Sequence, residues 1–229
     1  MSARGVFISG TDTSCGKTCV GQALARDARA AGKRVRILKP VETGCEERHG
    51  SRVPADALAL AEAAGDDRPV ASLCPFRLSL PAAPEIAARQ EGVRIELEPL
   101  LQAFAATAAD ADLVLVEGAG GLLVPLAPGL DMAGLAAALD LPIVVVARAA
   151  LGTINHTRLT LEALRSRGLT LCGVVFSHTE ADLSAADRAN LDLLLEDLPA
   201  PFRLELAHGS KSLGSDFDFA GFFDSLSER

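Results

Sequence analysis

The sequence predicts an α/β fold in which a mostly parallel sheet is wrapped by helices. Six short runs rich in Val, Ile and Leu alternate with helix-like segments, and most of these runs are continuously apolar. Continuous apolar runs are typical of strands that are buried on both faces. Three of the helix-like segments are followed directly by glycine, the usual left-handed helix stop. In such a fold the functional loops lie at the carboxyl edge of the sheet.

The expected elements follow from these runs and stops. The predicted strands are Val6–Ser9, Val35–Leu38, Leu113–Val116, Ile143–Ala147, Leu171–Phe176 and Phe202–Leu206. The predicted helices are Lys17–Ala31, Asp56–Ala64, Leu97–Ala108, Met132–Leu139, Asn155–Arg167 and Ala185–Glu196. The polar, turn-rich segment Gly44–Pro54 is interpreted as a surface loop. With 229 residues and 49% hydrophobic content the chain can bury one substantial core, and nothing in its length requires a second, so residues 1–229 are expected to form one domain.

The composition excludes several classes of partner. The 229 residues carry a formal net charge of −8 and no long Lys/Arg block, so no nucleic-acid or anionic-membrane surface is expected. The longest apolar stretches are far shorter than the roughly 20 residues that span a bilayer. The first residues contain no apolar signal region, and the five scattered cysteines lack Cys-x-x-Cys spacing. We therefore expect a cytoplasmic protein with free thiols.

A phosphate-binding loop is predicted directly after the first strand, in the segment Gly10-Thr11-Asp12-Thr13-Ser14-Cys15-Gly16-Lys17-Thr18. Backbone N–H groups and the positive helix end attract phosphate, Lys17 adds a point charge, and the Thr18 hydroxyl can ligate Mg²⁺. Five residues separate the two glycines where the usual pattern has four. The alternative is a flexible turn in which Lys17 is a solvated side chain. The expected nucleotide contacts here are Ser14, Cys15, Gly16, Lys17, Thr18 and Cys19.

Two carboxylates are candidate metal ligands. Glu117 follows the apolar strand Leu113–Val116, at whose carboxyl tip a lone carboxylate is costly unless it is paired or coordinating. Mg²⁺ prefers a hydroxyl, one or two carboxylates, waters and phosphate oxygens. The predicted metal ligands are therefore Thr18, Glu117 and Asp56. For Asp56 the alternative is that it only caps the helix that it opens.

These motifs resemble the dethiobiotin synthetase family, together with Lys39-Pro40-Val41-Glu42-Thr43-Gly44 and Leu151-Gly152-Thr153-Ile154-Asn155-His156. Further specific elements are Asp56-Ala57-Leu58 and Val116-Glu117-Gly118-Ala119-Gly120-Gly121. The resemblance covers nearly the whole chain. It implies a P-loop NTPase-like three-layer α/β fold, with ATP as co-substrate and Mg²⁺ as cofactor.

The resemblance also implies the reaction. 7,8-Diaminopelargonate, CO2 (or bicarbonate) and ATP would give dethiobiotin, ADP and phosphate, through a carbamate and a carbamic-phosphoric anhydride. Lys17 would span the γ-phosphate and the carbamate, and Lys39 would hold the carbamate from the opposite strand tip. These two lysines are the predicted catalytic residues. Taken alone, a lysine before a proline at a strand end, such as Lys39, is more often a surface charge.

The resemblance assigns the substrate to two further segments. Thr43 lies where the family has a substrate-contacting hydroxyl, usually serine. In the family the segment that corresponds to residues 152–155 reaches across a two-fold interface to the substrate's carboxylate tail, which implies a homodimer. Free N–H groups at a helix start attract such a carboxylate. The alternatives are that Asn155 caps the helix and that His156 serves packing or capping. The predicted substrate contacts are Thr43, Gly152, Thr153, Ile154 and Asn155.

The base-binding region departs from the family. Family members place an Asn-Asp pair after the fifth strand and a proline-containing segment after the next, whereas this chain has Ser177-His178 and Leu206-Ala207-His208-Gly209. A serine hydroxyl adapts to either hydrogen-bond polarity, so we expect relaxed nucleotide choice. The alternative is that backbone groups, His178 or His208 read adenine. The remaining implied nucleotide contacts are Asp56, Glu117, Gly118, Ala119, Gly120, Ser177 and His178.

Two other functions stay open at this point. One is a related ATP-dependent amidoligase or carboxylase of the same fold. The other is a nucleotide switch of the partitioning type, which commonly carries an additional lysine early in its phosphate loop, whereas residues 10–15 contain none. A guanine-specific GTPase would be expected to show an Asn-Lys-x-Asp motif, which this chain lacks.

Overall fold

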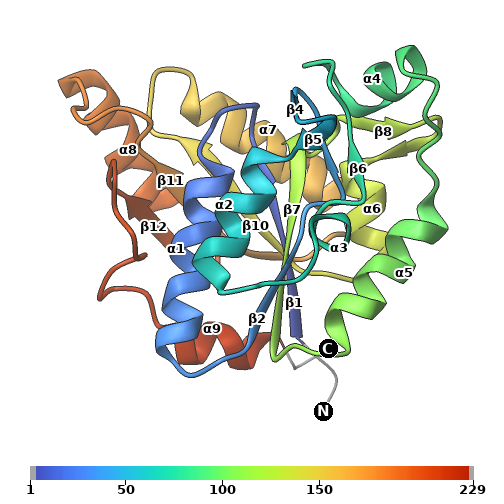
Figure 1. The fold of residues 1–229 in the computed structure, drawn as a ribbon. Coiled ribbons are helices and arrows are strands. Elements are labelled where there is room, and N and C mark those ends of the chain that lie inside the picture. The colour runs from blue at the N-terminus through green and yellow to red at the C-terminus, as the bar shows by residue number, and fades with distance from the viewer. Residues whose placement is uncertain (1–3, 227–229) are drawn as a thin grey trace.

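The computed structural model describes residues 4–226, and its centre is a six-stranded sheet in the order β12-β11-β10-β1-β7-β2. Every neighbouring pair in this sheet is parallel, which confirms the predicted fold class. The carboxyl ends of the strands point to the top of Figure 1. The strands are β1 (Arg4–Gly10), β2 (Val35–Leu38), β7 (Leu113–Gly121), β10 (Ile143–Arg148), β11 (Leu171–Ser177) and β12 (Arg203–Leu206).

Helices cover both faces of the sheet and complete the three predicted layers (Figure 1). One face packs against α1 (Lys17–Ala30), α2 (Ala55–Ala64), α3 (Val70–Leu73) and α9 (Phe219–Ser225). The other packs against α4 (Pro84–Gln90), α5 (Leu97–Ala108), α6 (Met132–Ala138), α7 (Thr153–Ser166) and α8 (Ala185–Asp197). Within residues 4–226, no helix is both long and apolar enough to cross a membrane.

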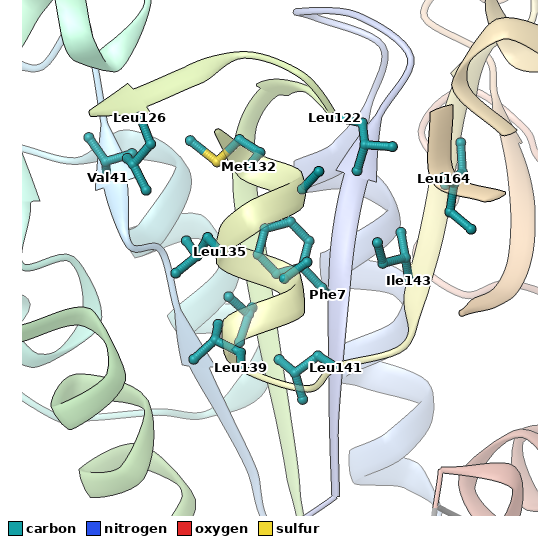
Figure 2. Packing of buried hydrophobic residues seen from close by; sticks show 14 of the residues in the cluster. Phe7, Val41, Leu122, Leu126, Met132, Leu135, Leu139, Leu141, Ile143 and Leu164 are labelled. Carbon is teal, nitrogen blue, oxygen red and sulfur yellow. The ribbon is translucent and has the colours of Figure 1, made fainter. Parts of the chain in front are cut away.

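The strand β1 shows why its sequence is continuously apolar. Val6 and Ile8 belong to the hydrophobic cluster under α1 and α2, whereas Phe7 belongs to the cluster on the opposite face. Successive side chains of a strand point to opposite faces, so a doubly covered strand needs apolar residues at every position. Figure 2 shows the Phe7 ring among side chains of α6 and its flanking loop. A β-carbon at Gly118 would lie 2.9 Å from that ring, so glycine lets β7 pass close to it.

Several short elements were not predicted. The segment 44–54, expected to be a loop, contains an antiparallel hairpin of β4 (Glu46–Arg48) and β5 (Ser51–Val53). Its turn residues His49 and Gly50 have positive φ angles of 52° and 72°, the conformation of a tight hairpin turn. The hairpin is mostly exposed and therefore has no apolar pattern. The other unpredicted elements are α3, α4, α9, β3 (Val41–Glu42), β6 (Phe76–Arg77), β8 (Pro125–Ala127) and β9 (Leu130–Asp131).

A buried carboxylate joins the end of α2 to the strand β2. The side chain of Asp66 is fully buried and accepts a 3.0 Å hydrogen bond from Ile37 N–H. It also accepts hydrogen bonds from Arg36 and Arg68, and Arg68 in turn donates to Thr107 of α5. Burial alone would raise the pKa of Asp66, but the hydrogen bonds from Arg68 and Ile37 outweigh it and lower the pKa.

We expect Asp66→Asn to lower the free energy of unfolding by about 3 kcal/mol at pH 7, because it breaks a buried ionic network. Asp67→Asn is the matched control, since the Asp67 side chain is 95% exposed. Because the pKa of Asp66 is lowered in the folded state, its carboxylate contributes fully to the free energy of unfolding above about pH 4. That contribution is lost as the pH falls through the folded-state pKa of Asp66. Urea unfolding should therefore show the gap between Asp66→Asn and wild type narrowing below pH 4. Equal stability of the two proteins at pH 7 would contradict this role.

Candidate functional site

A cleft of about 670 Å³ lies at the carboxyl edge of the sheet. It is lined by the phosphate loop, by residues that follow β2, β11 and β12, and by residues 117, 119 and 120 of β7. The predicted nucleotide contacts that line it are Ser14, Gly16, Lys17, Thr18, Cys19, Asp56, Glu117, Ala119, Gly120, Ser177 and His178. Cys15 and Gly118 are not among the lining residues, and Cys15 packs in the core under α1.

The phosphate loop is fixed by its packing against β11. Gly16 is the N-cap of α1 with a φ angle of 97°, and a β-carbon there would collide with the Ser177 side chain. Glycine is therefore required for both its conformation and its close approach. No side chain among residues 4–226 caps α1, which leaves its first N–H groups available to an anion. Lys17 is only 7% exposed and donates to the Asp12 carbonyl over 3.1 Å, so the interpretation as a solvated lysine is wrong.

A buried ion cluster lies beside this loop. Lys39 is 3% exposed, and its Nζ contacts Glu117 Oε1 and lies 3.1 Å from Asp56 Oδ2. The Thr18 hydroxyl donates to the same Glu117 oxygen over 3.0 Å. The surface interpretation of Lys39 is therefore wrong. Burial alone would lower the pKa of Lys39, but the attraction of Glu117 and Asp56 outweighs burial and raises the pKa, so the ammonium stays charged.

Thr18, Asp56 and Glu117 are brought together as the sequence predicts. Glu117 is fully buried, and its Oε2 has no hydrogen-bond partner among residues 4–226. No group of three or more His, Cys, Asp or Glu side chains in that range could hold a metal ion alone. One hydroxyl and two carboxylates are the donor set with which Mg²⁺ binds when phosphate oxygens and waters complete its shell. The residues present thus fit a nucleotide-bound magnesium ion.

Two boundaries near the cluster differ from the prediction. The strand β7 continues to Gly121 instead of ending at Val116. Its pairing with β2 ends at the Leu38–Val116 pair, while Glu117 is still paired with Ile8 of β1. The segment that follows β2 has left the sheet at that level, and its residue Lys39 contacts Glu117.

The second boundary concerns α2, which begins at Ala55, so Asp56 is not its cap. The cap is Glu42, a residue that was not predicted for the site, and its carboxylate accepts hydrogen bonds of 3.0 Å from the N–H groups of both Asp56 and Ala57. Burial raises the pKa of Glu42, and these two hydrogen bonds oppose the shift. Pro54, which precedes α2, has no side chain that can accept a hydrogen bond. This feature of the sequence indicated that the cap of α2 comes from another segment.

The residues expected to lie near the nucleotide base, which we call the base-side residues, are Ser177, His178 and His208, and they line the same cleft. Ser177 is buried at the end of β11. His178 Nε2 lies 2.7 Å from Glu205 Oε1, outside hydrogen-bond geometry. A hydrogen bond from Arg188 is the main cause that lowers the pKa of Glu205. Thr43 also lines the cleft.

The predicted substrate segment 152–155 lies elsewhere. Gly152, Ile154 and Asn155 line a separate hollow of about 550 Å³, beside Leu151, which is 80% exposed. The N-cap of α7 is Gly152, so the alternative that Asn155 caps this helix is wrong. His156 is exposed, so it does not pack against the rest of this chain. One chain by itself does not bring this segment to Lys39.

The parallel sheet, the glycine-bearing loop between β1 and α1, and the lysine and threonine that open α1 define a phosphate-loop nucleotide-binding protein. The sequence model of the AAA domain family matches residues 4–206. The ATP-dependent dethiobiotin synthetase BioD of Anaeromyxobacter dehalogenans (strain 2CP-C) is 45% identical over 218 residues, which cover 93% of this chain and 96% of that protein. The enzyme of the same name from Xanthomonas axonopodis pv. citri (strain 306) is 43% identical, covering 86% and 87%. The chain belongs to the dethiobiotin synthetase family, whose members are ATP-dependent ligases of biotin biosynthesis.

Solved structures agree on the fold. The cell division protein FtsY of Thermotoga maritima aligns with a TM-score of 0.57 at 16% identity, covering 99% of this chain and 69% of that one. The signal recognition particle receptor FtsY of Elizabethkingia anophelis also gives a TM-score of 0.57, at 14% identity, covering 100% of this chain and 64% of that chain. At these identities the likeness shows a shared phosphate-loop fold alone.

The ion cluster makes a prediction about stability. We expect Lys39→Met to lower the free energy of unfolding by about 3–5 kcal/mol, because it leaves Glu117 charged and buried without a counter-ion. The double variant Lys39→Met/Glu117→Gln should recover part of that loss, since the unpaired charge is gone. Lys211→Met is the control; Lys211 is exposed, and the change should stay within about 0.5 kcal/mol. Urea unfolding measures all four proteins, and a double variant no more stable than Lys39→Met would refute the pairing.

Proposed function

We propose that this chain carboxylates 7,8-diaminopelargonate with CO2 and closes its urea ring to give dethiobiotin, at the cost of ATP hydrolysed to ADP and phosphate. The observation that carries the proposal is the buried cluster of Lys39, Glu117 and Asp56, which lies in the same cleft as Lys17. Two cations in one cleft suit a reaction whose substrates include a triphosphate and a carbamate. The names of the most similar relatives support the same reaction.

The proposed reaction makes and breaks bonds in three stages. One amine of the diamine adds to CO2 to form a carbamate, and a carbamate oxygen then attacks the γ-phosphorus and releases ADP. The second amine attacks the carbonyl carbon of the resulting mixed anhydride, so that phosphate leaves and the ring closes. Lys39 holds the carbamate against loss of CO2, and Lys17 stabilises charge on the transferred phosphoryl group. Thr18, Asp56 and Glu117 would hold Mg²⁺, which when bound would neutralise charge on the phosphate oxygens.

The substrate's tail is assigned to a second copy of the chain. The segment 152–155 opens α7 without a side-chain cap among residues 4–226, so its N–H groups suit a carboxylate. Leu151 and Leu159 beside it are 80% and 61% exposed, which suits a surface covered by another subunit. In a two-fold homodimer the segment of one subunit would complete the cleft of its partner.

The direct test measures ADP release by the purified protein with ATP and Mg²⁺. Release should require both diamine and bicarbonate, because phosphoryl transfer needs the carbamate as acceptor. Lys17→Ala should lower turnover by about 10²-fold or more, the loss typical of a removed charge-stabilising donor. ATP hydrolysis that is indifferent to diamine would contradict the proposal and favour a nucleotide switch.

The shared site makes a prediction about mixed dimers. We expect Lys17→Ala and Asn155→Ala each to inactivate the homodimer, and a mixture of the two chains to regain activity. After random exchange half of the dimers are hybrids, and each hybrid holds one intact site, so about a quarter of wild-type activity should return. Native mass spectrometry verifies the exchange. Absence of recovery among proven hybrids would rule out a site shared between subunits.

The base-side residues predict relaxed nucleotide choice. Ser177 offers one short hydroxyl where the family has an amide, so a wrong base leaves fewer buried groups unsatisfied. We expect CTP or GTP to support turnover within roughly tenfold of ATP, equivalent to about 1.4 kcal/mol. Comparison of kcat/KM for the three nucleotides at fixed Mg²⁺ decides the matter. A thousandfold preference for ATP would instead identify another adenine reader, such as His178 or His208.

A further inference from the structure

The helix α2 begins without a cap of its own. Its N-cap residue is Pro54, which has a φ angle of −83° and a ψ angle of 95° and offers no side-chain acceptor. Helix starts ordinarily need such an acceptor, because the N–H groups of the second and third helical residues have no partner within the helix. In α2 these are the N–H groups of Asp56 and Ala57.

Glu42 supplies the missing cap from a distant part of the chain. The residue is 6% exposed, and its Oε1 accepts from Asp56 N–H while its Oε2 accepts from Ala57 N–H, each over 3.0 Å. The side chain thus binds both N–H groups at once. Its negative charge also lies at the positive end of the helix dipole, where it is stabilised.

The cap bears on the site because of where Asp56 lies. The later part of α2 is held to α1 by other contacts, among them a hydrogen bond from Gln22 to the Ala59 carbonyl. The first turn depends on Glu42, and this turn carries the carboxylate that lies 3.1 Å from Lys39 Nζ. A first turn that frays would release Asp56 from the cluster while leaving the rest of α2 in place.

We propose that Glu42 is a positioning residue, which caps α2 through both carboxylate oxygens and thereby holds Asp56 in place beside Lys39 and Glu117. The role of Asp56 as a metal ligand rests on the proposed function, whereas the cap does not. Glu42 lines the same cleft as Lys39 and Asp56, but in this account it acts through the backbone of α2, from which both of its oxygens accept hydrogen bonds.

Glu42→Gln tests the proposal, because an amide can accept at one position only and turns an N–H donor toward the other. Pro54→Ser, added to it, places an ordinary N-cap side chain at a residue whose extended backbone suits one. Glu91→Gln is the matched control. Glu91 likewise accepts two backbone hydrogen bonds, from Ser79 and Leu80, far from Asp56 in the chain.

Hydrogen exchange of the enzyme without nucleotide or metal reads the cap directly. Glu42→Gln should speed exchange at the first-turn amides of α2 by about five- to tenfold, the addition of Pro54→Ser should restore it, and Glu91→Gln should leave it unchanged. Mn²⁺ affinity in the presence of ADP, measured by electron paramagnetic resonance, should weaken by a similar factor in Glu42→Gln and recover with Pro54→Ser. At saturating metal, kcat should stay within about threefold of wild type.

Two results would overturn the proposal. Unchanged exchange in Glu42→Gln would show that no cap is present. Restored exchange with metal affinity or turnover still lost would show that Glu42 acts on ligands directly. A wild-type protein without diamine-dependent turnover would overturn the proposed function alone, because exchange and Mn²⁺ affinity need neither diamine nor turnover.

Discussion

The contact between Lys39 and Glu117 places two opposite charges at the carboxyl edge of the sheet, where water hardly reaches either of them. Neither charge is tolerated alone at such depth, since an unpaired buried ion costs several kcal/mol. Two segments must therefore meet for the fold to be stable: the residue that follows β2, Lys39, and the middle of β7, which carries Glu117. The first turn of α1 joins them there, because Thr18 donates a hydrogen bond to Glu117. The same meeting assembles the cleft. Folding and function thus depend on one set of contacts.

This dependence limits how the site can change. Lys39 contacts both carboxylates that we assign to the metal ion, so its charge contributes to stability as well as to the site. Lys17, by contrast, only bends back to a loop carbonyl. Removal of Lys17 should therefore affect turnover with little effect on stability, whereas removal of Lys39 affects both. A variant at Lys39 is interpretable only when its stability is measured beside its activity.

The sequence predicted what is encoded locally. The six strands and the phosphate loop follow from apolar runs and from the order of Gly16, Lys17 and Thr18. Five of the strands lie within two residues of their expected bounds, whereas β7 runs on to Gly121. The burial of Lys39 and the cap from Glu42 could not be predicted, because they join residues 78 and 14 positions apart through packing that no local pattern records. The hairpin in 44–54 was missed because exposed polar strands lack periodic apolar residues. The assignment of Asn155 to the substrate stays a prediction, since within a single chain Asn155 lines a different hollow from the cleft.

The central claim is that the cleft built around Lys39 makes a cyclic urea from a diamine, CO2 and ATP. Mass spectrometry of the product formed from 7,8-diaminopelargonate, ATP, Mg²⁺ and carbon-13 bicarbonate tests it most directly. We expect a product with the mass of dethiobiotin plus that of the isotopic label, formed in equal amount to ADP and about 10²-fold or more slowly with Lys17→Ala. A product without the label, or ADP released while the diamine is recovered unchanged, would contradict it.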